Sequence, residues 1–124
     1  MTEQRDFFAQ VNEPRDLEII TDLEKKHLPV ITAPDQVKRG ECFEVTVEVG
    51  KLLTHPNENA HFIEFIELYA GQIYLARLDF TARTTCPVMK VCVSLDKDLG
   101  PLRAFARCNL HGVWEGTRPA PSVG

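Results

Sequence analysis

Apolar and polar residues alternate along much of the chain after residue 40, and this alternation predicts strands. Between residues 42 and 49, Phe43, Val45, Val47 and Val49 are separated by polar or charged residues. A period of two is typical of a strand with one buried face. The same period recurs in three later segments: 73–82, 88–95 and 101–107.

Two further segments complete the expected sheets. Residues 61–69, HFIEFIELY, also fit one face of a helix, but their β-branched and aromatic content favours a strand. Another strand is expected within 30–39. Residues 3–10 predict a short helix or an ordered arm, and 11–29 predict a long, charged loop. Several short strands divided by turn residues predict an all-β fold, an antiparallel β-sandwich.

Length, composition and net charge limit the classes of protein to which this chain could belong. The chain has 124 residues, enough for one domain, and 44% of them are hydrophobic, so an ordered fold is expected. A net charge of −4 without a block of like charge argues against a nucleic-acid or membrane-surface binder. The N-terminal sequence does not have the pattern of a secretory signal, and no apolar run is long enough to span a membrane. We therefore expect a cytoplasmic protein whose four cysteines are free thiols or metal ligands.

The histidines are the first candidates for chemistry, because each lies in a loop or at a strand end. His55 and His61 flank the loop HPNENAH, Cys108 and His111 frame CNLH, and His27 stands in KKHLP. A turn within each loop segment could bring its two side chains to one metal. Taken singly, each motif also fits exposed loop histidines or a buried cysteine beside a surface histidine.

The other three cysteines are interpreted as thiols without a role in the predicted metal site. Cys86 and Cys92 lie six residues apart, which places both on one face of a strand, where they are too distant for a disulfide. Small core or surface thiols are the preferred interpretation, and a redox pair is the alternative. Cys42, at the start of a strand, is expected to pack.

Three segments together resemble a known family. They are KKHLP at 25–29, HPNENAH at 55–61 and CNLHGVWE at 108–115. Their order and internal spacing are similar to the signature EKHxP, HPNxxxH and CNxHGxWE of the superoxide reductase family, whose iron-binding domain is called neelaredoxin or desulfoferrodoxin. The resemblance covers residues 23–116 and is closest to the one-iron class.

The resemblance implies a fold and a domain organisation. The expected fold is an immunoglobulin-like antiparallel β-sandwich of about seven strands, preceded by a short N-terminal helix or arm. Residues 1–22 would form the arm, 23–118 the iron-binding sandwich, and 119–124 a flexible tail.

The resemblance also implies the ligands of a mononuclear non-haem iron. Four histidines would surround the iron in a plane, a cysteine would be axial, and the sixth position would face solvent. The implied ligands in this chain are His27, His55, His61, Cys108 and His111. One departure concerns the family glutamate that can fill the sixth position: Lys25 stands in its place, and Glu24, one residue earlier, could substitute if the loop shifts. The family lysine falls on Lys26, and Trp114 is expected to pack beside the site.

Four nitrogens and one sulfur with one vacancy suit iron better than structural zinc, which is normally closed by four ligands. The implied activity is reduction of superoxide to hydrogen peroxide by one electron and two protons. Lys26, with Lys25 adding to it, would attract the anion locally despite the net negative charge. The implied partners are superoxide, an external electron donor of the rubredoxin type, and further copies of the chain in a homodimer or homotetramer.

Other functions remain open at this stage. A metal-stabilised, non-catalytic β-sandwich binding module would share the ligands but hold a closed, redox-silent metal. A plain immunoglobulin-like interaction module would bind no stoichiometric iron. Superoxide dismutation is a third possibility, which would require the iron to oxidise superoxide as well.

Overall fold

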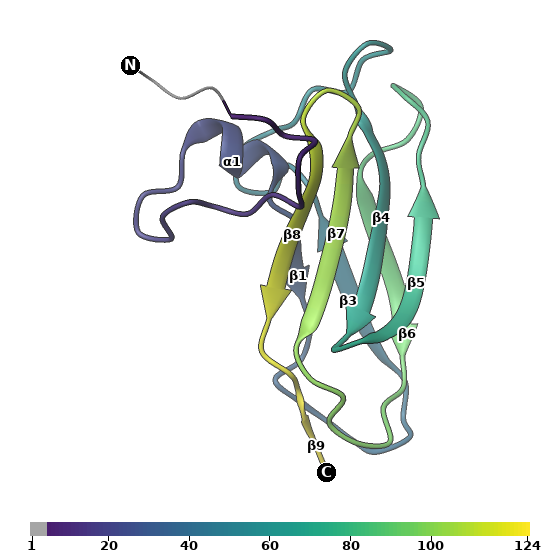
Figure 1. Ribbon diagram of the computed structural model, residues 1–124. Coiled ribbons are helices and arrows are strands. Elements are labelled where there is room, and N and C mark those ends of the chain that lie inside the picture. The colour runs from purple at the N-terminus through teal and green to yellow at the C-terminus, as the bar shows by residue number, and fades with distance from the viewer. Residues whose placement is uncertain (1–4) are drawn as a thin grey trace.

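The alternating segments form two antiparallel sheets that pack face to face (Figure 1). The computed structural model describes residues 5–124. One sheet has the order β1-β3-β6, with β1 at Val30–Thr32, β3 at Phe43–Glu48 and β6 at Val88–Val93. The other has the order β5-β4-β7-β8, with β4 at Ile63–Ala70, β5 at Ile73–Asp79, β7 at Leu102–Cys108 and β8 at Gly112–Arg118. The prediction of an antiparallel sandwich of about seven strands is confirmed.

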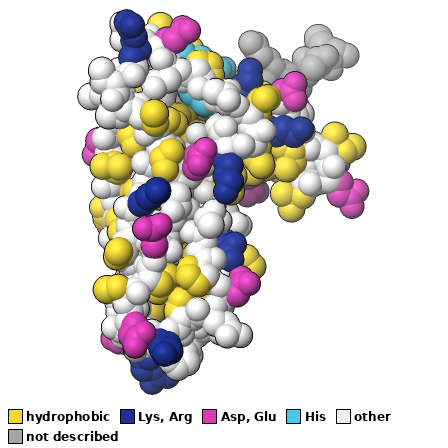
Figure 2. All heavy atoms as spheres, turned by 180° about the vertical axis from the view of Figure 1, so that it is seen from behind, with side chains coloured by type: hydrophobic (Ala, Val, Ile, Leu, Met, Phe, Trp, Pro, Cys, Tyr) yellow, Lys and Arg dark blue, Asp and Glu magenta, His cyan; other side chains and the backbone are white. Residues whose placement is uncertain are grey.

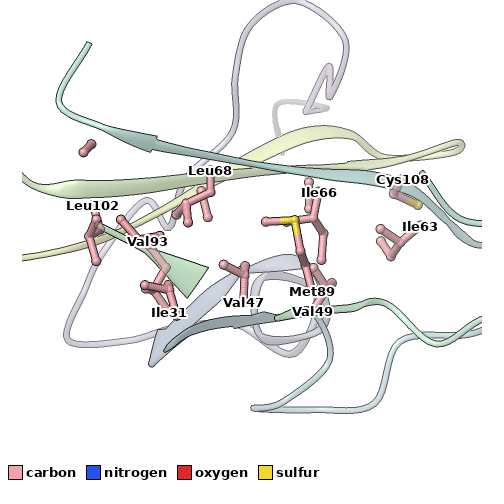
Figure 3. Packing of buried hydrophobic residues seen from close by; sticks show 14 of the residues in the cluster. Ile31, Val47, Val49, Ile63, Ile66, Leu68, Met89, Val93, Leu102 and Cys108 are labelled. Atoms are coloured by element: carbon pink, nitrogen blue, oxygen red, sulfur yellow. The ribbon is translucent and has the colours of Figure 1, made fainter. Parts of the chain in front are cut away.

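The core lies between the sheets and follows the period of two. In β7, Leu102, Ala104, Ala106 and Cys108 are buried, while the residues between them face outward. Figure 3 shows Leu102 near one end of the apolar layer and Cys108 near the other, beside Ile63. Ile63 and Cys108 are also cross-strand partners. The thiol therefore closes one end of the hydrophobic core.

The segment 30–39 differs from the single strand that its sequence predicts. It is divided into β1 and the short β2 at Gln36–Val37, with Pro34 between them, because proline cannot donate a ladder hydrogen bond. β2 pairs in parallel with β9 at Ser122–Val123. The predicted flexible tail at 119–124 is therefore wrong for its last residues, since Gly124 N also donates to Val37 O at 3.1 Å.

A short helix interrupts the region that the sequence predicts as a loop. Helix α1 spans Asp22–His27 and begins with a capping box, in which Glu24 N donates to Thr21 Oγ1 and Thr21 N donates to Glu24 Oε1. The signal was present in the sequence as threonine followed three residues later by glutamate. Within residues 5–124, no helix is long and apolar enough to cross a membrane.

The N-terminal arm packs directly on β8. Asn12 is 4% exposed, and its side-chain amide donates to Phe7 O at 2.8 Å and Val113 O at 2.9 Å. The backbone of Asn12 also pairs with Val113 and Glu115. Gly112 permits this approach, because a Cβ there would lie 2.1 Å from Phe7 O. The arm and the sandwich thus share buried hydrogen bonds.

The buried carboxylate of Glu24 makes stability depend on pH. Burial by itself would raise the pKa of Glu24, but hydrogen bonds from Thr21, Arg15 and Arg5 outweigh it and lower the pKa below 4.5. A lowered folded-state pKa contributes stability above the unfolded value, and this stability is lost as the pH falls through the folded pKa. We expect the free energy of unfolding of the metal-free protein to fall more steeply below pH 4.5 than that of Glu24→Gln, as measured by denaturant titration. Parallel pH profiles would contradict this.

Candidate metal centre

The predicted ligands gather at one end of the sandwich, although they come from four parts of the chain. His27 ends α1, His55 lies in the loop after β3, and His61 lies two residues before β4. Cys108 ends β7, followed by His111 in the turn to β8. These segments meet at the end of the molecule opposite β9 (Figure 1). Figure 2 shows histidine side chains at that end, partly covered by surrounding atoms.

Four of the five side chains form a tight cluster. One ligand atom from each of His27, His55, His61 and Cys108 lies within 4.8 Å of all the others. The Nε2 atoms of His27 and His55 are 3.2 Å apart. His111 stands beside the cluster, with its Nδ1 3.7 Å from the sulfur of Cys108 and its ring centroid 4.8 Å from that of His27. The structure therefore brings together all five residues that the sequence predicts.

Backbone carbonyls orient two of the imidazoles. His27 Nδ1 lies 2.7 Å from Leu23 O, one turn earlier in α1, and His55 Nδ1 lies 2.6 Å from Pro56 O. A carbonyl oxygen only accepts, so in both rings Nδ1 carries the proton and donates. The lone pair is left on Nε2, which faces the cluster, and this arrangement is common for histidines that bind metals.

The histidines are poor bases in this environment. Burial, partly opposed by the hydrogen bonds to Leu23 and Pro56, lowers the pKa of His27 and of His55 to about 4. Both are therefore neutral at pH 7, as ligands must be. His61 Nε2 is buried without a hydrogen-bond partner in the described part of the chain, which is costly unless another group binds it. The donor set fits a metal ion.

Cys108 supplies the sulfur from a site with no exposed surface. Burial raises the pKa of its thiol, and the backbone amides of Leu110 and His111 partly offset this. A bound cation would favour the thiolate strongly, because thiolates are the form that binds metals. Iron or zinc would thus compete with a proton at this sulfur.

Two asparagines hold the ligand loops. Asn109, within CNLH, accepts from Phe62 N at 2.9 Å and donates to Ala60 O at 2.9 Å, which ties the Cys108 turn to the segment around His61. Asn57, within HPN, is bound in the same two-way manner to the loop between β5 and β6. The local sequence does not indicate these contacts, because the partners are distant in sequence.

The acidic and basic neighbours of His27 have different surroundings. Glu24 is 1% exposed, and both of its carboxylate oxygens accept hydrogen bonds from Thr21, Arg15 and Arg5. It is not part of the ligand cluster, so this conformation does not place it as a sixth ligand. Lys25 and Lys26 are half-buried.

Lys26 acts on the cluster electrostatically. Burial is the main cause of the lowered pKa values of His55 and His61, and the positive charge of Lys26 lowers both further.

The remaining cysteines lie outside the ligand cluster and form no disulfide. Cys42, Cys86 and Cys92 are free and exposed. The expectation that Cys42 starts a strand and packs is wrong, because Cys42 is exposed, β3 begins one residue later, and Phe43 packs against the core instead. Trp114 does pack beside the site, as predicted: it is fully buried, and its ring stacks on that of His27 at 5.1 Å.

Comparison with known proteins agrees with this geometry. The family model for desulfoferrodoxin matches residues 19–117. The chain belongs to the desulfoferrodoxin family. A relative from Methanocaldococcus jannaschii is 50% identical over 98 residues, covering 77% of this chain and 82% of that protein. The superoxide reductase of Pyrococcus furiosus is 35% identical over 109 residues, covering 73% and 85%.

Solved structures show the same likeness to the desulfoferrodoxin family in three dimensions. The superoxide reductase (neelaredoxin) of Ignicoccus hospitalis has a TM-score of 0.71 and 38% sequence identity, covering 79% of this chain and 81% of that one. The superoxide reductase of Nanoarchaeum equitans has a TM-score of 0.69 at 30% identity, covering 89% and 99%.

Proposed function

We propose that this member of the desulfoferrodoxin family is a superoxide reductase with one mononuclear iron held by His27, His55, His61, His111 and Cys108. The observation that carries the proposal is the convergence of four neutral imidazoles and one cysteine at one end of the sandwich. Several relatives with this family's domain are named superoxide reductases.

The reaction consumes one superoxide, one electron and two protons, and it produces one hydrogen peroxide. Iron held by these five residues would supply the electron. The residues of the chain orient the ligands and would tune the metal. The carbonyls of Leu23 and Pro56 fix the direction of two imidazoles, and Cys108, as a thiolate, would donate electron density to the iron from a site with no exposed surface.

Lys26 is proposed to steer superoxide to the site, with Lys25 as a second positive charge. Lys26 directly precedes the predicted ligand His27 in the last turn of α1, which places a positive charge next to the ligand cluster. We expect Lys26→Ala to slow the second-order reaction with superoxide by about 10-fold at low salt and to flatten its dependence on ionic strength. Lys90→Ala is the control, because Lys90 is exposed on β6. Equal rates and salt slopes in all three proteins would rule out steering.

Iron must be reduced again after each turnover, and the described residues hold only this one cluster of predicted metal ligands. We therefore propose an external electron donor of the rubredoxin type. A homodimer or homotetramer and a cytoplasmic location are proposed on the family resemblance alone.

The decisive experiment is anaerobic mixing of the reduced, iron-loaded protein with superoxide. One hydrogen peroxide formed per iron oxidised, without release of oxygen, is the expected result. Oxygen release would indicate dismutation instead. A colourless protein that binds zinc in preference to iron would indicate a metal-stabilised binding module, since ferric iron bound to thiolate should absorb visible light.

A further inference from the structure

Arg5 lies in the N-terminal arm, and its guanidinium contacts a carboxylate, a backbone carbonyl and two aromatic rings. Nη1 donates to Glu24 Oε2 at 3.0 Å, and Nη2 donates to Glu13 O at 3.0 Å. The same group lies 4.8 Å from the centre of the Trp114 ring and 5.3 Å from that of Phe7. Only 18% of the Arg5 side chain and 1% of the Glu24 side chain are exposed. This is an anchored cation rather than a surface one.

Each aromatic partner of Arg5 in turn contacts a predicted iron ligand. The Trp114 ring stacks on His27 with an interplanar angle of 21°, and its Nε1 donates to His111 O at 2.9 Å. The ring of Phe7 meets that of His111 edge-on at 5.0 Å. Two contact chains therefore run from Arg5 to the cluster, one through Trp114 and one through Phe7.

Physical chemistry gives Arg5 a specific task in this arrangement. A guanidinium is flat, so it can stack on an aromatic ring while its edge binds a carboxylate, which an ammonium cannot do equally well. Cation–π attraction is stronger where water is excluded, as it is at the fully buried Trp114. Without Arg5, the arm loses one of its anchors, and the buried carboxylate of Glu24 loses the only ion-pair partner that residues 5–124 give it.

We propose that Arg5 is a positioning residue of the metal centre. By holding Trp114, Phe7 and Glu24 together, it fixes the packing surface behind His27 and His111, and so sets the geometry in which these rings bind metal. The proposal rests on the proposed function only in requiring that the cluster binds a metal ion. Arg5 and Phe7 lie outside the matched segment 19–117, so the family signature contains neither of them.

Cobalt(II) binding to the purified protein tests this without measuring activity. Trp114 is the single tryptophan of the chain, so its fluorescence reports on the contact with His27. We expect Arg5→Ala to shift the tryptophan emission to longer wavelength, to alter the visible cobalt spectrum, and to raise the Kd for Co²⁺ about 10-fold, as typical of lost outer-sphere support. Arg5→Lys should recover only part of the loss, because it keeps the charge without the flat fork.

Two further variants keep the test decisive. Arg77→Ala is the matched control, because Arg77 also stacks on a ring, that of Phe65 at 3.9 Å, and pairs with Asp79, but on β5. It should bind Co²⁺ as the wild type does. Arg5→Ala combined with Glu24→Gln removes the unpaired buried charge, so it covers the case in which the single variant does not fold.

The outcomes separate this proposal from the proposed function. Weaker Co²⁺ binding and an altered spectrum in the folded single or double variant, but not in Arg77→Ala, support the positioning role. Wild-type binding and spectra in a folded Arg5 variant would overturn the positioning role alone. A wild-type protein without a sulfur-to-cobalt absorption band would overturn the metal centre, and this proposal with it.

Discussion

Cys108→Ser should remove the visible sulfur-to-iron absorption band of the ferric protein and slow its reaction with superoxide by at least about 100-fold, since even outer-sphere changes typically cost 10–100-fold. The reason is that Cys108 is the only cysteine in the cluster that the described residues form. Its sulfur is fully buried, so no solvent thiol can readily replace it. Absorption spectroscopy and stopped-flow mixing with superoxide measure both effects.

The matched control for this variant is Cys92→Ser. Cys92 is a free, exposed thiol on β6, outside the cluster. It should keep the wild-type spectrum and rate. If the band survives in Cys108→Ser, or disappears in Cys92→Ser, the assignment of the sulfur ligand is wrong.

Gly116→Ala should destabilise the protein by about 3 kcal/mol, at the upper end of the usual cost of forcing an extra methyl group into a packed site. A Cβ at Gly116 would lie 2.0 Å from Pro29 O, and a backbone atom cannot swing away as a long side chain can. Pro29 follows His27 by two residues, so the displaced backbone should also weaken metal binding. Denaturant unfolding of the metal-free protein and titration with Co²⁺ measure the two effects separately.

Gly124→Ala controls for the loss of glycine itself. A Cβ at Gly124 would meet no atom within 4 Å. The free energy of unfolding of Gly124→Ala should therefore stay within about 0.5 kcal/mol of the wild-type value. If Gly116→Ala is as stable as Gly124→Ala, the close approach of β8 to Pro29 does not constrain the fold.

The fold could be predicted largely because its strands bury one face each. Val45 and Val47 in β3 and the buried residues of β7 follow the period of two that the sequence displays. Glycine, proline and asparagine marked several turns. The five predicted ligands could be grouped only through motif spacing and family resemblance, since nothing in the local sequence of His27 indicates that it lies 3.2 Å from His55.

What the sequence did not reveal depends on contacts between distant residues. Helix α1 has only six residues, too few to produce a clear helical period, and its capping box at Thr21 lies among charged neighbours that are typical of a loop. The strand pairing of Ser122 with Gln36 joins segments that are distant in sequence. Likewise, the contact of Arg5 with Trp114 spans most of the sequence, and no local pattern encodes it.

Among the described residues, Cys108 alone is both part of the hydrophobic core and part of the ligand cluster. Substitutions of neighbouring core residues should therefore change how strongly the Cys108 sulfur donates electron density to a metal. A mutant library at Ile63, the cross-strand partner of Cys108, would vary the packing around the sulfur without replacing any ligand. A library at Leu102, at the far end of the same core, would change the stability of the protein without changing the packing around the sulfur. Engineering of the sulfur–metal bond should therefore start at the core.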